Sequence, residues 1–217
     1  MKLVYFNLKG LAESSRILLA INNEKYDDYR YNFSVIDASK HQYNKPEFDN
    51  DKNDKKLLKS MNKLPYLEID GEIICQSKSI ERFLARRFNM MGDNEIQIAK
   101  IDSICESIRD IKDAYQNVRN TQQEKKEEAM NIWFNDTLPE RLTLLSNLFD
   151  EEGKYCINNK LSLADIVLFS LITQFFDNVD GSMNAASKNP RIIKIINSIF
   201  DIEEVKKWIK DRPNTMF

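Results

Sequence analysis

The sequence predicts an α/β unit joined to an all-helical unit, and two observations carry that prediction. Through residue 88, short apolar runs of strand length alternate with helical patterns. From Asn94 onward, apolar residues recur only at the helical spacings of three, four or seven. We therefore expect an N-terminal domain at residues 1–88 and a C-terminal domain at residues 94–217.

The chain opens with a predicted strand, helix and strand. Residues 3–6 form a short apolar and aromatic run typical of a buried strand, which ends at the Lys9-Gly10 turn. A helical pattern with one apolar face follows over residues 17–21. Residues 29–33 then alternate aromatic and polar side chains, the period of a half-buried strand. This order favours a parallel strand pair joined by a right-handed crossover.

A hairpin and a helix complete the predicted first domain. Two short apolar segments flank Asp70-Gly71, which is a strong signal for a tight β-turn. Ser77 stands where an N-cap is expected, ahead of a further helical pattern. The intervening residues 37–60 are rich in Lys, Asp and Asn, so we expect a solvated loop there, with one short helix near its end.

The second domain is expected to contain several helices. Two long amphipathic segments come first, and residues 136–139 are expected to bend the second of them. Ser162 with Asp165 three residues later is a variant of the capping box, ahead of a helix apolar almost all round. Pro190 suits the first turn of another helix, and residues 203–210 predict one more.

Composition excludes several classes of protein. With 32 basic and 34 acidic residues the formal charge is −2, which argues against an electrostatic nucleic-acid binder. No run of eighteen apolar residues exists to cross a membrane, and the N-terminal apolar stretch is too short for a signal peptide, so a cytoplasmic location is expected. Cys75, Cys105 and Cys156 are far apart and form no ligand cluster with His41, so we expect neither a metal site nor a disulfide framework.

Three features carry candidate chemistry. Tyr5 lies near the end of the first strand, where a phenol can donate a hydrogen bond to an anion. The backbone at Leu64, before Pro65, can pair with an extended peptide. Gln76 and Ser77 precede a helix, whose first N–H groups can bind a carboxylate. Taken singly, each feature is more often a packing residue, a strand boundary or an ordinary cap.

The motifs together resemble those of sigma-class glutathione transferases, the class that includes haematopoietic-type prostaglandin D synthase. The resemblance covers most of the chain and rests on Tyr5-Phe6-Asn7-Leu8-Lys9-Gly10 with Ala12-Glu13 and Arg16, Asn62-Lys63-Leu64-Pro65-Tyr66, Gln76-Ser77-Lys78-Ser79, Leu161-Ser162-Leu163-Ala164-Asp165 and Trp208-Ile209-Lys210 with Arg212-Pro213. It implies a thioredoxin-like N-terminal domain, an all-α C-terminal domain and a homodimer.

The resemblance also implies an activity, in which the thiolate of the co-substrate glutathione is joined to small hydrophobic electrophiles without a metal. Tyr5 would donate to the glutathione sulfur and Leu64 would pair with the cysteinyl part. Lys63 would lie near the glycyl end, and Gln76 with Ser77 would hold the γ-glutamyl carboxylate. Asp110 would reach the γ-glutamyl amine across the dimer interface, unless it is an ordinary solvated carboxylate.

One departure from the resemblance bears on the reaction. Leu11 stands where prostaglandin D synthases carry an arginine that helps to activate the thiol. This departure argues against prostaglandin isomerase activity. A glutathione-dependent isomerase is still kept as an alternative, as is a non-catalytic glutathione-binding or ligand-binding module. A thiol–disulfide oxidoreductase is disfavoured, because that class needs a cysteine near the end of the first strand, where this chain has Tyr5 and Asn7.

Overall fold

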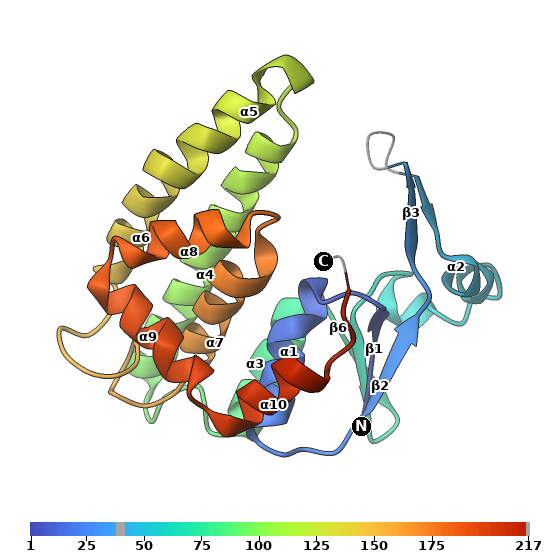
Figure 1. Ribbon diagram of the computed structural model, residues 1–217. Helices are drawn as coiled ribbons and strands as arrows, with labels where there is room; N and C mark the ends of the chain where they lie inside the picture. The colour runs from blue at the N-terminus through green and yellow to red at the C-terminus, as the bar shows by residue number, and fades with distance from the viewer. Residues whose placement is uncertain (38–41, 216–217) are drawn as a thin grey trace. The chain divides into compact units, whose positions relative to one another are not determined.

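A computed structural model describes residues 1–37 and 42–215, so His41 lies outside the described residues. The chain forms two compact units (Figure 1). The first comprises Met1–Leu84 together with the described residues from Lys207 onward, and the second comprises Ala85–Lys206. The C-terminal segment thus returns to the unit that holds the N-terminus.

The first unit is built on a four-stranded sheet in the order β2-β1-β5-β6. Its strands are β1 (Lys2–Phe6), β2 (Asp27–Tyr31), β5 (Tyr66–Ile69) and β6 (Glu72–Cys75). The predicted parallel pair is β1 with β2, whereas β1–β5 and β5–β6 are antiparallel. The predicted hairpin around Asp70-Gly71 is therefore confirmed, and the mixed sheet is that of a thioredoxin-like domain.

Helices cover both faces of this sheet. In Figure 1, α1 (Glu13–Ile21) and α3 (Ser77–Arg87) lie on one side of it and α2 (Pro46–Asn53) lies on the other. A single 3-10 turn, Gly10–Ala12, precedes α1. Helix α1 buries seven of its nine residues, which include both apolar and charged side chains. The burial of apolar side chains such as Leu18 drives this packing.

The segment at residues 37–60 differs from the predicted loop with a helix near its end. The pair β3 (Ser34–Asp37) and β4 (Gln42–Asn44) is antiparallel, and α2 follows directly at Pro46. Phe48 is 7% exposed and Leu57 is 3% exposed, and both join a core cluster with Val4 of β1. A short 3-10 helix does lie near the end of the segment, at Leu58–Ser60, but the solvated loop was wrong for the part that forms β4 and α2. Two buried apolar side chains are enough to anchor this otherwise polar segment.

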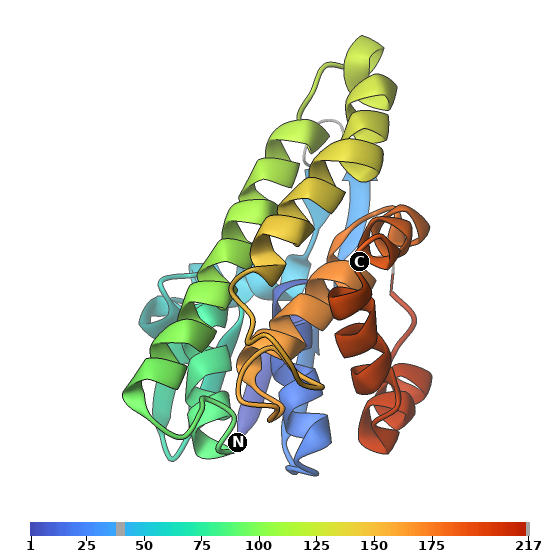
Figure 2. The ribbon, with the colours of Figure 1, turned by 90° about the vertical axis from the view of Figure 1, so that its left-hand side faces the viewer.

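The second unit begins with a helical hairpin, seen side by side as the green and yellow helices of Figure 2. Helix α4 (Glu95–Arg119) is capped by Asn94, whose side chain accepts a hydrogen bond from the Gln97 N–H at 3.0 Å. Helices α5 (Gln123–Ile132) and α6 (Leu138–Ser146) are joined by a π-helical turn at Trp133–Thr137. The bend predicted at residues 136–139 falls on the end of this turn and the start of α6, where the backbone stays helical.

Helix α7 (Leu163–Ser170) is the core of the second unit, with all eight residues buried. Its predicted capping box is present between Ser162 and Asp165. A π-helical turn at Leu171–Phe175 follows it. The remaining helices are α8 (Val179–Ser187), which was not predicted, then α9 (Pro190–Phe200) and α10 (Glu203–Asp211). Among the described residues, no helix is long and apolar enough to cross a bilayer.

Candidate functional site

The sheet register brings three of the candidate features to one edge. Tyr66, the first residue of β5, pairs with the residue before Tyr5 on one side and with the residue before Gln76 on the other. One step further along the three strands, Tyr5, Pro65 and Gln76 therefore stand in a row across the sheet. Residues that are 71 positions apart in sequence, Tyr5 and Gln76, thus share one end of the fold.

The Tyr5 side chain is 7% exposed, and its hydroxyl oxygen accepts a hydrogen bond from the Leu11 N–H at 3.2 Å. This bond occupies the oxygen as an acceptor and leaves the phenolic hydrogen available to donate. Burial raises the pKa of Tyr5 above its ordinary value, and this outweighs the lowering by the Leu11 N–H and the Arg16 charge. Because the pKa is raised, the hydroxyl stays protonated at neutral pH and remains a donor.

Gly10 allows the loop after β1 to approach this hydroxyl. Its φ of +41° is in the left-handed region, and a Cβ added there would lie 2.7 Å from the Tyr5 hydroxyl oxygen. Such a contact is shorter than side chains tolerate, so any larger residue must displace the loop or the phenol ring. The position of the Tyr5 hydroxyl therefore depends on the absence of a side chain at residue 10.

The segment before β5 forms the middle of the row. The Leu64–Pro65 peptide bond is cis. The Leu64 side chain is half-buried against the cluster that contains Val4, whereas Lys63 is exposed. The Lys63 N–H donates to the Ser60 carbonyl at 3.1 Å, which ties the segment to the preceding turn. Lys63 directly precedes Leu64 in the sequence and thus lies beside the row.

Gln76 is the cap of α3. Its carbonyl oxygen accepts the first helical hydrogen bond, from the Ile80 N–H at 3.0 Å, so the N-cap is Gln76 and the prediction of Ser77 was one residue late. Gln76 has a φ of +73°, which is uncommon for a residue with a side chain and is found at ligand-binding positions. The first N–H groups of a helix have no partner within the helix, so the start of α3 favours an anion.

Asp110 belongs to the second unit. It is exposed on α4. The sheet register brings Tyr5, Leu64, Gln76 and Ser77 of the first unit together, with Lys63 beside them.

Arg16 is part of the motif that carries the resemblance, but the sequence assigned it no role. Its side chain is fully buried on α1, where it donates to the Leu8 carbonyl at 2.7 Å and to Asp28 at 3.1 Å. A charge is expensive to bury unless it is paired, so these bonds hold the loop after β1 firmly. The available signal was an arginine within the apolar face of a predicted helix, beside Ile17.

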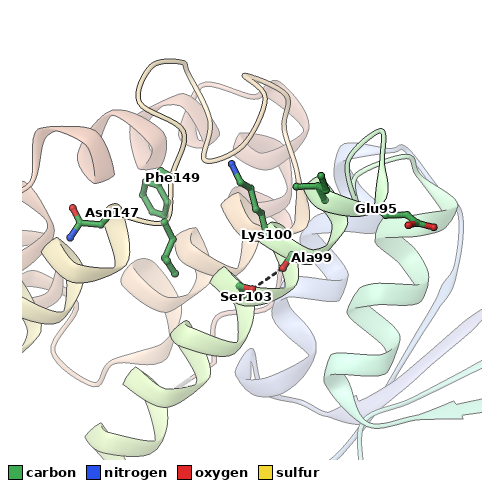
Figure 3. A pocket seen from close by; sticks show the side chains of 8 residues that line it. Glu95, Ala99, Lys100, Ser103, Asn147 and Phe149 are labelled. Carbon is green, nitrogen blue, oxygen red and sulfur yellow. Dashed lines mark hydrogen bonds between the residues drawn. The ribbon is translucent and has the colours of Figure 1, made fainter.

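A separate pocket lies in the second unit, with a volume of about 570 Å³. Figure 3 shows its lining side chains, which come from the first turns of α4 and from the chain after α6. They are Glu95, Ile96, Ala99, Lys100, Ser103, Asn147, Leu148 and Phe149. None of the predicted site residues lines this pocket. Lys100 is already paired with Asp150 at 3.0 Å, so the pocket offers no free cation from that side chain.

Comparisons with known proteins agree with both units. The family model described as "Glutathione S-transferase, N-terminal domain" matches residues 1–86, and "Glutathione S-transferase, C-terminal domain" matches residues 109–212. Glutathione S-transferase P 10 of Caenorhabditis elegans is 30% identical over 169 residues, which cover 77% of this chain and 72% of that protein. Hematopoietic prostaglandin D synthase of Gallus gallus is 28% identical over 214 residues, covering 99% and 97%.

Solved structures show the same architecture. The crystal structure of monomeric Na-GST-3, a glutathione S-transferase from the hookworm Necator americanus, superposes with a TM-score of 0.78 at 26% sequence identity. The match covers all of this chain (100%) and 98% of the hookworm chain. The likeness therefore extends over both compact units of the chain.

Proposed function

The chain belongs to the glutathione S-transferase family and is a glutathione transferase, and from this premise we propose how its site works. The thiolate of glutathione is joined to small hydrophobic electrophiles, and the Tyr5 hydroxyl stabilises that thiolate by donating a hydrogen bond. Leu64 binds the cysteinyl part through its backbone, with Lys63 near the glycyl end. Gln76 and Ser77 hold the γ-glutamyl carboxylate.

The observation that carries this proposal is the row formed by Tyr5, Pro65 and Gln76 at the sheet edge. Glutathione is an extended tripeptide with a carboxylate at each end and a thiol in its middle. An exposed backbone beside a strand suits an extended peptide, and a helix N-terminus suits a carboxylate. A phenol in the same row supplies a hydrogen-bond donor that stabilises the thiolate and so lowers the pKa of the thiol.

The energetics are consistent with a single donor. Lowering a thiol pKa from about 8.5 by about two units requires roughly 2.7 kcal/mol of preference for the thiolate. A hydrogen bond to a charged group contributes about 1.5–3 kcal/mol. One hydrogen bond from the Tyr5 hydroxyl can therefore supply the required free energy, provided that the hydroxyl is held within hydrogen-bonding distance of the sulfur.

The residue next to this hydroxyl supports an apolar second substrate. Leu11 is 49% exposed, although its own N–H is bonded to the Tyr5 hydroxyl. A large apolar side chain is thus presented to solvent beside the proposed sulfur position. Burial of that side chain by a bound electrophile is favourable at about 25 cal/mol per Å² of apolar area. Hence we propose small hydrophobic molecules as the second substrate.

The proposal for Ser77 is tested by replacing it with alanine in a conjugation assay that uses glutathione and an aryl halide. We expect the KM for glutathione to rise about tenfold with kcat little changed, because a hydrogen bond to a carboxylate is lost in substrate and transition state alike. Ser79→Ala is the matched control, since Ser79 is exposed on the same first turn. Absence of turnover in the wild-type protein would refute the proposed reaction, and an unchanged KM would remove Ser77 from the site.

A second candidate is a glutathione-dependent isomerase, favoured by the 28% identity to the chicken prostaglandin D synthase. The same machinery would serve it, because the thiolate again attacks the substrate first. The two reactions differ in stoichiometry. Conjugation consumes one glutathione for each product formed, whereas isomerisation returns the glutathione, so titration of the remaining thiol decides which reaction occurs.

We also propose that the protein is a homodimer, in which Asp110 of one protomer reaches the γ-glutamyl amine bound by the other. Asp110 is exposed on α4 and so is open to a second copy. The hookworm relative is described as monomeric, so membership of the family does not by itself require pairing. Light scattering is expected to give twice the chain mass of 25.5 kDa. The mass of a single chain would remove the proposed role of Asp110 but not that of Tyr5.

A further inference from the structure

A buried carboxylate in the first unit accepts hydrogen bonds from residues near the C-terminus. Glu13, the first residue of α1, is 1% exposed. Its Oε1 atom accepts a hydrogen bond from Trp208 Nε1 at 2.8 Å and another from Arg212 Nη1 at 2.6 Å. A buried carboxylate must be paired, so these bonds tie the C-terminal segment to the start of α1.

Arg16 connects the same carboxylate to the loop after β1. Glu13 Oε2 pairs with Arg16 Nη1 at 3.4 Å. Arg16 in turn donates to the Leu8 carbonyl at 2.7 Å and to the Lys9 carbonyl at 3.4 Å. Its guanidinium carbon lies 5.9 Å from the centre of the Tyr5 ring. The loop that these bonds hold is the one whose end donates an N–H to the Tyr5 hydroxyl.

The pKa of Lys9 shows that the charges of Arg212 and Glu13 act on the loop after β1. Burial lowers the pKa of Lys9 first, the positive charge of Arg212 lowers it further, and Glu13 acts in the opposite direction. Arg16 and Arg212 are the cations bonded to Glu13, and Asp28 pairs with the other side of Arg16. Removing Arg212 would therefore change both the bonding and the field at the loop.

We infer that Trp208 and Arg212 are positioning residues for the Tyr5 hydroxyl, acting through Glu13 and Arg16. This inference rests on the proposed role of Tyr5 as the donor to the thiolate. The two residues contribute by holding the loop, and hence the hydroxyl, at the distance the sulfur requires. Misplacing a reacting group by about 1 Å can cost on the order of 100-fold in rate, so even a small loop shift is measurable.

The test compares Trp208→Phe, which removes only the indole N–H, with Arg212→Met and with the double variant. The pH dependence of kcat/KM for the electrophile is measured at saturating glutathione, where it reports the ionisation of the bound thiol. In the double variant we expect the apparent pKa of the bound thiol to rise and kcat/KM near pH 6.5 to fall about three- to tenfold. The effects of the two single substitutions need not add, because both residues bond to the same carboxylate. Lys206→Met is the control, since it breaks an exposed pair with Glu203 on the same helix.

Repeating the substitutions in a Tyr5→Phe background separates positioning from stability. We expect no further loss there, because the hydroxyl to be positioned is absent. A purely structural role would instead lower the unfolding temperature with the pH profile unmoved, or would give equal losses in both backgrounds, and either result would overturn the inference. If Tyr5→Phe alone left the profile unchanged, the proposed function would fail first, and the inference with it. Should the double variant not fold, Trp208→Phe alone supplies the same comparison.

Discussion

Replacement of Tyr5 by phenylalanine is expected to raise the pKa of the bound glutathione thiol by about one to two units, since a hydrogen bond of about 1.5–3 kcal/mol is lost at 1.36 kcal/mol per unit. Near pH 6.5, kcat/KM should fall about 5- to 50-fold, because a smaller fraction of the thiol is ionised. At a pH above the thiol pKa of both proteins, most of this difference should disappear. The measurement is the pH profile of conjugation at saturating glutathione.

Tyr26→Phe is the matched control for that substitution. The Tyr26 hydroxyl is also buried, but it has no hydrogen-bond partner among the described residues. Its removal is therefore expected to leave the conjugation profile unchanged. Equal rates for the wild-type protein and Tyr5→Phe across the whole pH range would contradict the role assigned to Tyr5.

The second large effect is expected from Gly10→Ala. The new Cβ would meet the Tyr5 hydroxyl oxygen at 2.7 Å and its ring carbon Cε1 at 3.0 Å, so the ring or the loop must move. The left-handed backbone adds a cost of about 1–2 kcal/mol for any residue with a Cβ. We expect kcat/KM to fall at least about tenfold, together with that loss in the free energy of unfolding. Kinetics and denaturant unfolding measure the two quantities separately.

Gly71→Ala distinguishes these two consequences. Gly71 also has a positive φ, +81°, but nothing lies within 4 Å of the Cβ that alanine would add. The same backbone penalty is therefore expected without any change in activity. If Gly10→Ala kept the activity of Gly71→Ala, the close approach at residue 10 would have no part in catalysis.

Local signals predicted much of the fold. The hairpin was readable because Asp70-Gly71 lies between two apolar segments, and its turn requires the positive φ values found at both residues. The start of α7 was readable because Ser162 and Asp165 have the spacing of a capping box. In each case the information lies within a few neighbouring residues, so no long-range contact is needed to interpret it.

The segment around α2 shows where local reading fails. Phe48 packs edge-on against Phe6, with ring centres 5.1 Å apart, and Tyr31 donates to Asp51 at 2.7 Å. These partners are 20 or more positions apart in the sequence, so the polar composition of the segment concealed them. Its strand and helix are stabilised by tertiary contacts that a single sequence does not display.

Part of the candidate site was also readable from local sequence, and part depends on long-range contacts. Tyr5 and Gln76 were recognisable from motifs, but their alignment across the sheet follows from the register of three strands. The bonds from Trp208 and Arg212 to Glu13 span 195 and 199 positions and could not be anticipated. Motifs thus identified the groups that we propose to bind glutathione, whereas the contacts that hold those groups became visible only in the fold.

The central claim, that the Tyr5 hydroxyl keeps the bound thiol ionised, is tested most directly by ultraviolet titration of the thiolate in the glutathione complex. We expect a bound thiol pKa of about 6.5 in the wild-type protein and a value approaching the free thiol pKa of about 8.5 in Tyr5→Phe. Identical titration curves for the two complexes would contradict it.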